Sequence, residues 1–526
     1  MKINKPSYNL IASVVLSAVL LFLAGCTKDY DKINTNPNAV ADVDASQIPF
    51  LFSKAQSAAP GSQWNYQVAE NLFADQYAQY FACVATYFPS DRLVIRQDWV
   101  GAAFNPMYTD VMPQLQSIFA ATDTMSAEHA IASIWWVYTF HRVTDYWGPI
   151  PYFSAGTAAA TVPYDPQDKI YDDFFKRLTE AAEVLKSHTL ETPYGSYDIV
   201  YGGDVNKWIK FCNTLRLRLA LRISKVDPGR AKTEAEAAVA GGVLTTSPDD
   251  DALVQRSTKG SDGNGLSIMS DWNEFRMSAS MESVLKGYSD PRISEYFIPA
   301  VSTGTYEGVR NGLTSTQLTQ TPNTANANSH VGPRWASPAA GGLSTYLSTP
   351  QNVMCTAEAY FLRAEGAMNS WNMNGTAKDL YEAGIKASMH QWGYTDDAVI
   401  NNYINSTATP VAPQDFTNAP PMTNIPVKFN EANAAAAREQ IATQKWLALF
   451  PDGMEAWADY RRSHVLKLYP VVNSDNSDIT NTSTQWIRRI PFLLSEQQTN
   501  TDAVTDAVKL LNGPDNVLTP LWWDKN

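Results

Sequence analysis

Apolar residues recur at the helical period along much of the chain, which predicts a mainly α-helical protein. In residues 169–187, for example, large apolar side chains fall on one face while charged side chains occupy the other. The same periodicity predicts further helices over 70–85, 107–121, 127–144, 207–224, 230–240, 355–371, 376–392 and 439–450. The run Pro451-Asp452-Gly453 is expected to end the last of these helices.

Two of the predicted helices, 355–371 and 376–392, resemble one tetratricopeptide repeat within residues 353–400. Small residues on both helices would let them approach closely, and large residues would fill the gaps between them. Because a single repeat cannot bury its apolar face alone, the helices at 127–144 and 169–187 are expected to supply another pair. An ordinary helical hairpin explains each of these matches about as well.

Two long polar segments separate the predicted helices. Residues 311–352 carry a single charge, Arg334, and residues 401–430 contain five prolines. A long run without helical or strand periodicity inside a compact chain is typical of a functional loop or of local disorder. We therefore expect a loop-rich insertion over 242–352, with binding loops carried on a helical frame.

The first 26 residues have the pattern of an export signal rather than of folded structure. Lys2 and Lys5 precede a mostly apolar run over 10–23, which is 14 residues long. A transmembrane helix needs about 20 such residues, whereas a secretory signal needs fewer. The ending Leu23-Ala-Gly-Cys26 resembles the lipobox of bacterial lipoproteins. We predict a signal peptide over 1–25 and lipidation of Cys26, with palmitate among the acyl chains; the alternative is an ordinary signal peptide with an incidental cysteine.

The residues after Cys26 are polar, and several are Asp or Asn. Over 26–48 they predict an extended tether between the lipid and a folded domain over 49–526. Several acyl chains on one residue bury enough CH₂ groups for stable membrane attachment, which a single chain does not. The sequence therefore predicts a lipid-anchored protein whose body stands off the bilayer.

The composition fits a folded chain and excludes some classes of function. The chain has 526 residues, 44% hydrophobic and 18% charged, with a net charge of −13 at pH 7. A disordered chain would have few aromatic residues and many charges, and a nucleic-acid-binding surface would need clustered Lys and Arg. We expect no nucleic-acid partner. The 15 Trp, 25 Tyr and 20 Phe can supply flat surfaces for a ligand as well as core side chains.

Motifs of common catalytic and cofactor sites do not occur. The sequence has no H-E-x-x-H, G-x-S-x-G or P-loop, and no G-x-G-x-x-G that opens a helix. A turn explains Asp249-Asp250-Asp251 better than catalytic carboxylates do. Residues 260–265 and 473–478 offer oxygen ligands for calcium without EF-hand spacing. We expect no metal and no cofactor, with calcium left open, although distant residues can still assemble a site.

The cysteines after Cys26 are odd in number, and none has C-x-x-C spacing. They are Cys83, Cys212 and Cys355, and each lies in an apolar helical pattern. We expect them to be small buried side chains; a disulfide between two of them stays open.

Several separate motifs together resemble the SusD/RagB family of lipoproteins. The resemblance begins with the lipobox and the helix pair described above. The other motifs are Asn34-Thr-Asn-Pro-Asn38, Thr144-Asp-Tyr-Trp-Gly-Pro-Ile-Pro-Tyr152, Glu439-Gln-Ile-Ala-Thr-Gln-Lys-Trp-Leu-Ala-Leu-Phe450, Glu455-Ala-Trp-Ala-Asp-Tyr-Arg-Arg462, Arg489-Ile-Pro-Phe492 and Thr519-Pro-Leu-Trp-Trp-Asp524. They span essentially the whole mature chain in the order of the family, and the combination is specific although no single motif is.

The resemblance implies a SusD-like α-helical scaffold with tetratricopeptide-type helix pairs and long irregular ligand-binding loops. It further implies a non-enzymatic lipoprotein exposed on the outer membrane. Members cover a SusC-type TonB-dependent transporter and capture oligosaccharides, or in some cases peptides, for import. Their tetratricopeptide helices face the transporter, and the loops opposite hold the ligand. The rival functions are a surface glycoside hydrolase and a purely structural subunit of the transporter.

Six residues are candidates for binding the ligand. Sugars present apolar C–H faces and many hydroxyls, so a site needs aromatic platforms and a few polar groups. In the family, the loop between the first helices contributes to the site, which favours Asp91, Trp99 and Asn105. The other candidates are Arg334 and Trp335, in the long neutral loop, and Trp272, between Asp271 and Asn273. The alternative for each is a packed loop anchor, the role expected of Tyr146, Trp147, Trp522 and Trp523.

Overall fold

Helices make up most of the regular structure, as the sequence pattern predicts. The computed structural model describes residues 44, 46–61, 63–157, 159, 161–336 and 346–525. The predicted signal peptide and Cys26 lie outside the described residues, as does nearly all of the predicted tether. The chain from Ile48 to Asn526 forms one compact unit, and the description below concerns this unit alone.

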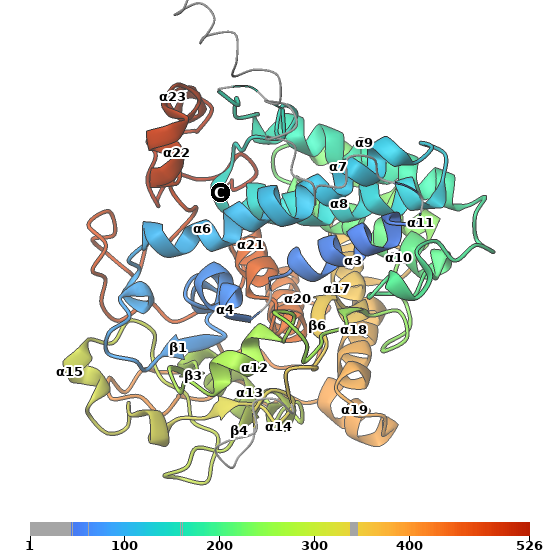
Figure 1. Cartoon of the computed structure of the whole chain (residues 1–526). Coiled ribbons are helices and arrows are strands. Elements are labelled where there is room, and N and C mark those ends of the chain that lie inside the picture. Colours follow the sequence, from blue (N-terminus) through green and yellow to red (C-terminus); the bar gives the residue numbers. More distant parts are fainter. Residues whose placement is uncertain are drawn as a thin grey trace, which may run out of the picture. The chain divides into compact units, whose positions relative to one another are not determined.

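The longer helices form the frame of this unit (Figure 1). They are α3 (Ile48–Ala58), α6 (Gln97–Pro106), α7 (Met112–Ala121), α8 (Ala127–Trp147), α9 (Gln167–Leu185), α10 (Val205–Arg222), α11 (Pro228–Gly241), α13 (Ala279–Gly287), α17 (Thr356–Met368), α18 (Ala377–Gln391), α19 (Asp397–Ile404), α20 (Ala434–Leu449), α21 (Gly453–Ser463) and α23 (Thr501–Lys509). In Figure 1, α7, α8 and α9 lie side by side in the upper part, and α17, α18 and α19 follow one another down the right-hand side.

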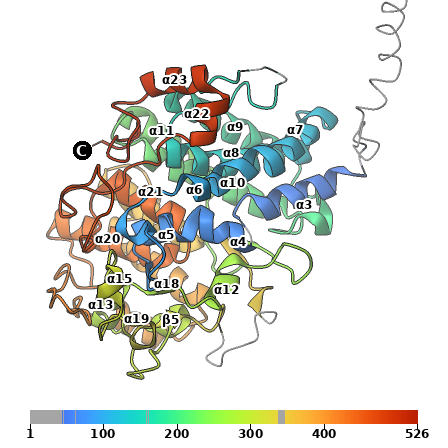
Figure 2. The same ribbon diagram turned by 60° about the vertical axis from the view of Figure 1, so that its left-hand side comes forward.

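Shorter helical turns connect the frame to the loops. They are α4 (Gln63–Tyr66), η1 (Gln67–Asn71), α5 (Ala74–Tyr77), η2 (Ser90–Arg92), η3 (Met107–Val111), η4 (Gly195–Tyr197), α12 (Gly265–Ser270), α14 (Ile293–Tyr296), α15 (Ser315–Leu318), η5 (Ala325–Ala327) and α22 (Leu494–Thr499). Figure 2 shows α5 beside α21, near the middle of the unit.

The central helix of the frame is α8. Every residue from Ala130 to Trp147 is buried, so other parts of the protein cover this helix on all sides, and its buried Arg142 and Asp145 have ion-pair partners there. The hydroxyl of Ser126 caps its first turn by accepting the N–H of His129 at 3.2 Å. The helix ends at Gly148, whose φ of 89° suits glycine. It therefore extends three residues beyond its predicted end, and Tyr146 and Trp147 form its last, buried turn.

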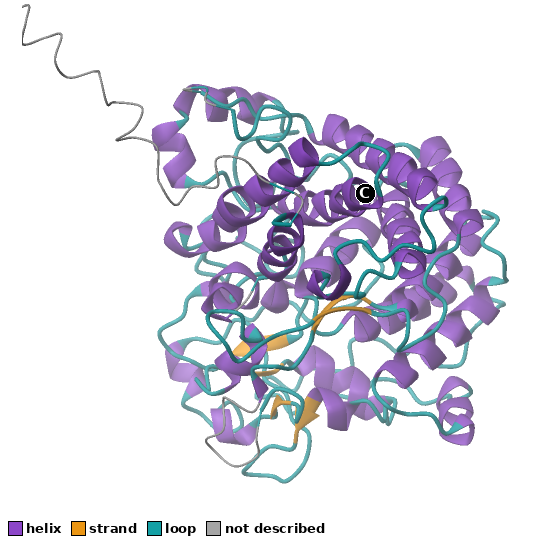
Figure 3. Cartoon of the chain, turned by 45° about the vertical axis from the view of Figure 1, so that its right-hand side comes forward, coloured by secondary structure: helices purple, strands orange, loops and turns teal. Residues whose placement is uncertain are grey.

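In the described part of the chain, three short antiparallel strand pairs connect segments in and around the loop-rich region (Figure 3). They are β1 (Phe81–Cys83) with β3 (Phe275–Met277), β2 (Ala252–Val254) with β6 (Gln351–Met354), and β4 (Phe297–Ile298) with β5 (His330–Val331). Each pair joins segments that lie far apart in the sequence. The region predicted as a loop-rich insertion over 242–352 thus also contains short helices and strands.

The predicted helix over 70–85 is wrong. The chain there forms η1, α5 and then β1. Phe73 interrupts the helix with φ −131° and ψ −93°, and Gln79 adopts a left-handed φ of 53°. Tertiary pairing of β1 with β3 decides the conformation here, although the apolar spacing alone favours a helix.

The helices α17 and α18 lie close together because a glycine stands at their contact. A Cβ atom at Gly384 would lie 2.7 Å from the ring of Phe361. The buried Tyr381 fills the neighbouring space and donates a hydrogen bond from its hydroxyl to the carbonyl of Val427 at 2.6 Å. The pair therefore has the small and large residues that its sequence suggested; its assignment as a tetratricopeptide repeat stays a prediction.

Buried ion pairs join α10 to three other helices. Arg218 makes two bonds to Glu358 of α17, at 2.6 and 2.7 Å. Arg222 pairs with Glu455 of α21 at 2.6 Å and with Asp145 of α8 at 3.2 Å. These side chains are almost completely buried, so each charge depends on its partner.

The three described cysteines, Cys83, Cys212 and Cys355, are buried free thiols. This agrees with their interpretation as small apolar side chains. No two of these three cysteines form a disulfide, a possibility that the sequence left open.

The contact between α17 and α18 predicts opposite effects for two Gly→Ala substitutions. Gly384→Ala should lower the free energy of unfolding by about 1–3 kcal/mol, because the added methyl group meets the Phe361 ring. Gly229→Ala in α11 is the matched control, since no atom lies within 4 Å of its Cβ position. It should be neutral or stabilise by up to about 1 kcal/mol. Urea denaturation measures both; equal effects would contradict the close approach.

Candidate ligand-binding surface

The pairing of β1 with β3 brings two of the predicted binding loops together. Cys83 lies opposite Phe275, and the N–H of Val84 donates to the carbonyl of Glu274 at 2.8 Å. The chain that leaves β1 therefore runs beside the chain that enters β3. The hydroxyl of Tyr87 donates to the Glu274 carboxylate, which ties the first loop to the second.

Three aromatic side chains form a ridge on the surface, two from the first loop and one from the first turn of α6. This aromatic ridge consists of Tyr87, Phe88 and Trp99. The ring centroids of Tyr87 and Phe88 are 4.6 Å apart, and those of Phe88 and Trp99 are 5.5 Å apart with near-perpendicular planes. Tyr87 is 67% exposed, and Trp99 is partly exposed. The ridge thus presents aromatic surface to solvent while its rings support one another.

Charged side chains border the ridge. The guanidinium of Arg96 lies 4.5 Å from the centroid of the Trp99 ring, so one face of that ring is covered by a cation. Arg96 is held there by two hydrogen bonds to Asp98, at 2.9 and 2.7 Å. The remaining surface of Trp99 therefore lies beside a cationic hydrogen-bond donor, Arg96, and an anionic acceptor, Asp98.

Trp272 lies on the neighbouring loop, directly after α12, and is 36% exposed. Its backbone N–H donates to the carbonyl of Met269 at 3.0 Å. Asn273 follows with a left-handed φ of 62° and turns the chain into β3. The strand pairing therefore places Trp272 on the loop that Tyr87 contacts through Glu274.

Asn105 is exposed but lies elsewhere on α6. It is six residues after Trp99, which corresponds to about 240° around the helix. Its carbonyl accepts the hydroxyl of Thr109 at 3.1 Å. The structure does not bring Asn105 onto the aromatic ridge, and its predicted role in binding remains untested.

Asp91 lies beneath the surface rather than on it. It is 4% exposed, and its two carboxylate oxygens accept the side-chain amide of Asn311 at 2.8 Å and the N–H of Gly312 at 2.9 Å. Burial raises the pKa of Asp91 to about 6. This geometry assigns Asp91 to bracing the first loop against residues 311–312, and leaves a direct ligand contact as a prediction.

Arg334 and Trp335 are anchors of the long neutral loop. The Arg334 guanidinium lies 4.3 Å from the Trp392 ring centroid and pairs with Glu295 at 3.1 Å. Trp335 is 4% exposed and packs against Trp392 and Phe450, with centroids 5.9 Å away in each case. Their side chains support the fold here, which is the alternative that the sequence left open; their predicted ligand contact is untested.

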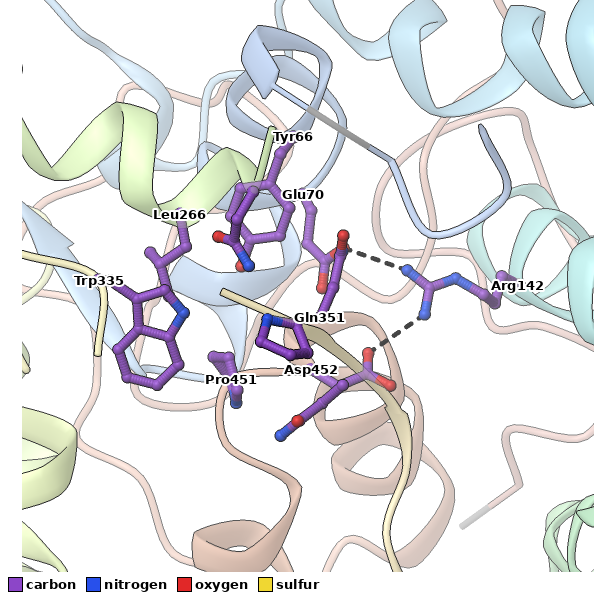
Figure 4. Close-up of a pocket in the computed structure, with 11 residues that line it drawn as sticks. Tyr66, Glu70, Arg142, Leu266, Trp335, Gln351, Pro451 and Asp452 are labelled. Atoms are coloured by element: carbon purple, nitrogen blue, oxygen red, sulfur yellow. Dashed lines mark hydrogen bonds and ion pairs between the residues drawn. The ribbon is translucent and has the colours of Figure 1, made fainter. Parts of the chain in front are cut away.

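A buried cluster of charges, which no sequence motif indicates, lies between α8, η1 and α21 (Figure 4). Arg142 contacts Glu70 at 3.1 Å and Asp452 at 3.4 Å. Asp75 lies nearby and accepts the hydroxyl of Tyr66 at 3.0 Å. Burial raises the pKa of Glu70 well above its ordinary value despite Arg142, and raises the pKa of Asp75 to about 7.

Carboxylates with raised pKa values are characteristic of glycoside hydrolases. This cluster is therefore the strongest candidate for a catalytic site among the groups described above. The cavity beside it, lined by Glu70, Arg142 and Asp452, has a volume of about 20 Å³. That volume holds one or two water molecules and is too small for a sugar ring. The cluster in this conformation is suited to holding helices together and not to cleaving a glycan.

In each of the oxygen-rich segments that left calcium open, one carboxylate is paired with an arginine of the protein. Asp262 accepts from Ser57 and pairs with Arg256 at 3.2 Å, and Asp475 pairs with Arg92 at 2.5 Å. Among the described residues, no group of three or more His, Cys, Asp or Glu side chains could hold a metal ion. In the same part of the chain, no helix is both long and apolar enough to cross a bilayer.

The fold and its surface define a mainly α-helical protein in which two of the exposed aromatic side chains, Tyr87 and Trp272, lie on loops joined by paired strands. The chain belongs to the SusD-like family: the family model described as "Susd and RagB outer membrane lipoprotein" matches residues 32–524. The family and fold class predicted from the sequence are confirmed. No curated protein sequence matches the chain.

Solved structures of this family superimpose on nearly the whole unit. A chitin-binding SusD homologue from Flavobacterium johnsoniae is 35% identical, with a TM-score of 0.82 over 91% of this chain and 99% of that one. A SusD homologue from Bacteroides uniformis is 32% identical, with a TM-score of 0.80 over 92% and 100%. A SusD-like protein from Bacteroides thetaiotaomicron is 31% identical, with a TM-score of 0.81 over 91% and 99%.

The buried cluster predicts a pH-dependent gain in stability for Asp75→Asn. The folded protein binds the Asp75 proton up to about pH 7, whereas an unfolded Asp releases it near pH 4. The stability that Asp75 contributes is therefore full below about pH 4 and is lost as the pH rises to about 7. Asn does not titrate, so the variant should gain about 1–3 kcal/mol relative to the parent between pH 5 and pH 8.

Urea denaturation at the two pH values measures this difference. The matched control is Asp397→Asn, at an exposed carboxylate paired with Lys386, which should change by less than about 0.5 kcal/mol. Parallel pH profiles for Asp75→Asn and the parent would show that Asp75 does not titrate in this range.

Proposed function

We propose that the protein captures oligosaccharides at the aromatic ridge and delivers them to a SusC-type TonB-dependent transporter without cleaving them. The observation that carries the proposal is the aromatic surface that Tyr87 and Trp272, on loops joined by β1 and β3, and Trp99, at the start of α6, present to solvent. A relative that shares 35% identity over 91% of this chain binds chitin. These two facts point to the same class of ligand.

The chemistry of the surface suits a sugar chain. The C–H faces of pyranose rings stack on aromatic rings, and Tyr87 and Trp99 supply such rings. Sugar hydroxyls need both donors and acceptors, which Arg96, Asp98 and Glu274 provide around the ridge. We take β-1,4-linked N-acetylglucosamine oligomers, the units of chitin, as the first probe.

The rest of the proposed function concerns the cellular location of the protein and the transporter with which it works. A lipid on Cys26 would anchor the protein in the outer membrane, with the residues before Ile48 as a tether. The family model's description as an outer membrane lipoprotein supports this part of the proposal. A transporter partner is proposed because capture without catalysis requires a separate import step.

Removal of the exposed indoles tests glycan capture. Trp99→Ala and Trp272→Ala should each weaken binding at least tenfold, or about 1.4 kcal/mol, because each removes a stacking surface. Affinity electrophoresis with polysaccharides and titration with chitin oligomers measure the loss. Phe153→Ala is the matched control, since Phe153 is an aromatic side chain outside the ridge that is more exposed than Trp272, at 55% against 36%.

The same samples separate the rival functions. Oligosaccharides recovered intact after long incubation support capture, whereas shortened products would establish a glycoside hydrolase. A peptide panel tests the alternative cargo. Binding by Trp99→Ala and Trp272→Ala equal to that of the parent would refute a site on this surface.

The membrane anchor has a test of its own. Cys26→Ala should move the protein from the outer membrane fraction to the soluble fraction, because the acylated thiol is lost. Fractionation followed by immunoblotting shows the distribution, and Cys83→Ala is the control because Cys83 is a buried thiol. Co-purification of the parent with a TonB-dependent transporter tests the partner; persistence of Cys26→Ala in the membrane fraction would contradict lipid anchoring.

A further inference from the structure

A second cavity lies behind the loop that carries the aromatic ridge. Its walls are α5 with the residues that follow it, η2, and two segments near the C-terminus, 457–471 and 482–487. Its volume is about 100 Å³, against about 20 Å³ for the cavity in Figure 4. We call this second cavity the cleft.

Polar atoms without hydrogen-bond partners are concentrated in the walls of the cleft. Sixteen buried side-chain N and O atoms of the described residues make no hydrogen bond within the protein, and five of them belong to four residues that line the cleft. These five are both amide atoms of Gln76, the hydroxyls of Tyr77 and Ser90, and the indole N–H of Trp486.

This concentration calls for an explanation, because nearly all buried polar groups in folded proteins are hydrogen-bonded. A donor or acceptor that is buried without a partner costs free energy. The neighbouring Gln79 shows the ordinary situation: its amide group donates to the Tyr469 carbonyl at 2.6 Å and accepts the Ser280 hydroxyl. Gln76, Tyr77, Ser90 and Trp486 are instead suited to hydrogen bonds with a molecule that enters the cleft.

The lining residues define the charge of that molecule. None of the residues that line the cleft is Lys or Arg, and Asp91 is their only carboxylate. Both oxygens of Asp91 are already bonded to Asn311 and Gly312. The free groups are therefore neutral, and they include both donors and acceptors. A neutral ligand with many hydroxyl or amide groups matches them, whereas an anion would find no counter-charge.

The lining residues also define the shape of that molecule. Five aromatic side chains line the cleft: Tyr77, Trp457, Tyr460, Tyr469 and Trp486. The rings of Tyr77 and Trp457 are 5.1 Å apart, and those of Tyr460 and Trp486 are 6.0 Å apart. Flat aromatic faces combined with neutral donors and acceptors are the requirements of a single sugar ring.

We propose that the cleft is a second carbohydrate site, which binds one neutral sugar ring. The ring is either a free monosaccharide or the end unit of a glycan chain. This inference rests on the proposed function for the class of ligand, and on the cleft alone for the position of the site. The turn η2 supplies Ser90 and Asp91 to the cleft and follows Tyr87 and Phe88 of the ridge directly in the sequence.

A matched pair of Tyr→Phe substitutions tests the site. Tyr77→Phe removes a hydroxyl without a partner, so it should weaken sugar binding at least tenfold and leave the melting temperature unchanged or higher. Tyr80→Phe removes a hydroxyl that donates to the Trp446 carbonyl at 2.6 Å and does not line the cleft. It should lower the melting temperature and leave sugar binding unchanged.

Ligand-observed NMR and calorimetric titration with N-acetylglucosamine, glucose, galactose and mannose, and with chitin oligomers, measure binding to the full mature protein. Loss of monosaccharide binding in Tyr77→Phe supports a site for free sugar. Weakened binding of oligomers in Tyr77→Phe, without monosaccharide binding by the parent, supports a site for a chain end.

Trp99→Ala separates this proposal from glycan capture at the ridge, because Trp99 does not line the cleft. It should lose retention by polysaccharide and keep any monosaccharide binding. The cleft proposal is overturned if the parent binds no monosaccharide and Tyr77→Phe binds oligomers as the parent does, which would leave water as the partner of these groups. That result would not affect the proposed function of the ridge.

Discussion

The arrangement of the frame depends on buried ion pairs that start from a single helix. Arg218 and Arg222 stand one turn apart on α10 and contact acidic residues of α8, α17 and α21. Once buried, neither a guanidinium nor a carboxylate has water to replace its partner, and loss of one partner commonly costs about 3–5 kcal/mol. The pairs therefore make alternative helix positions costly. Aromatic packing fills the space around them, as where Arg461 lies 3.4 Å from the ring centroid of Trp457.

The frame determines the positions of the surface loops. The helix α21, which the ion pairs fix, packs against α5 so closely that a Cβ atom at Gly453 would lie 2.8 Å from the Cα atom of Asp75. The chain continues from α5 into β1, and β1 pairs with β3. Two loops that are almost 190 residues apart in the sequence are thereby joined through Tyr87 and Glu274. Rigid positioning of this kind lets irregular loops present aromatic rings in one arrangement.

The sequence predicts the frame better than the loops, for physical reasons. The helices α9, α10, α17 and α18 are long and repeat apolar residues at the helical period, so this spacing is sufficient to predict them. The segment 70–85 has helical spacing too, but strand pairing with distant residues decides its structure. Arg334 is the single charge in a neutral loop, which suggested a ligand contact, yet its partly exposed guanidinium stacks on Trp392 of the protein itself. The cleft could not be predicted from the sequence, because Gln76 and Trp486 belong to no common motif and come together only in the folded protein.

The short turn η2 has a consequence for how the two proposed sites would communicate. The residues before it belong to the ridge, and its own residues form a wall of the cleft. Any displacement of this turn on binding of a long chain would alter the wall, and a molecule in the cleft would in return favour one position of the turn. Thermodynamic linkage makes such an influence reciprocal. A polymer and its smallest unit would then act as effectors of each other's affinity, so uptake would respond to the degree of digestion outside the cell.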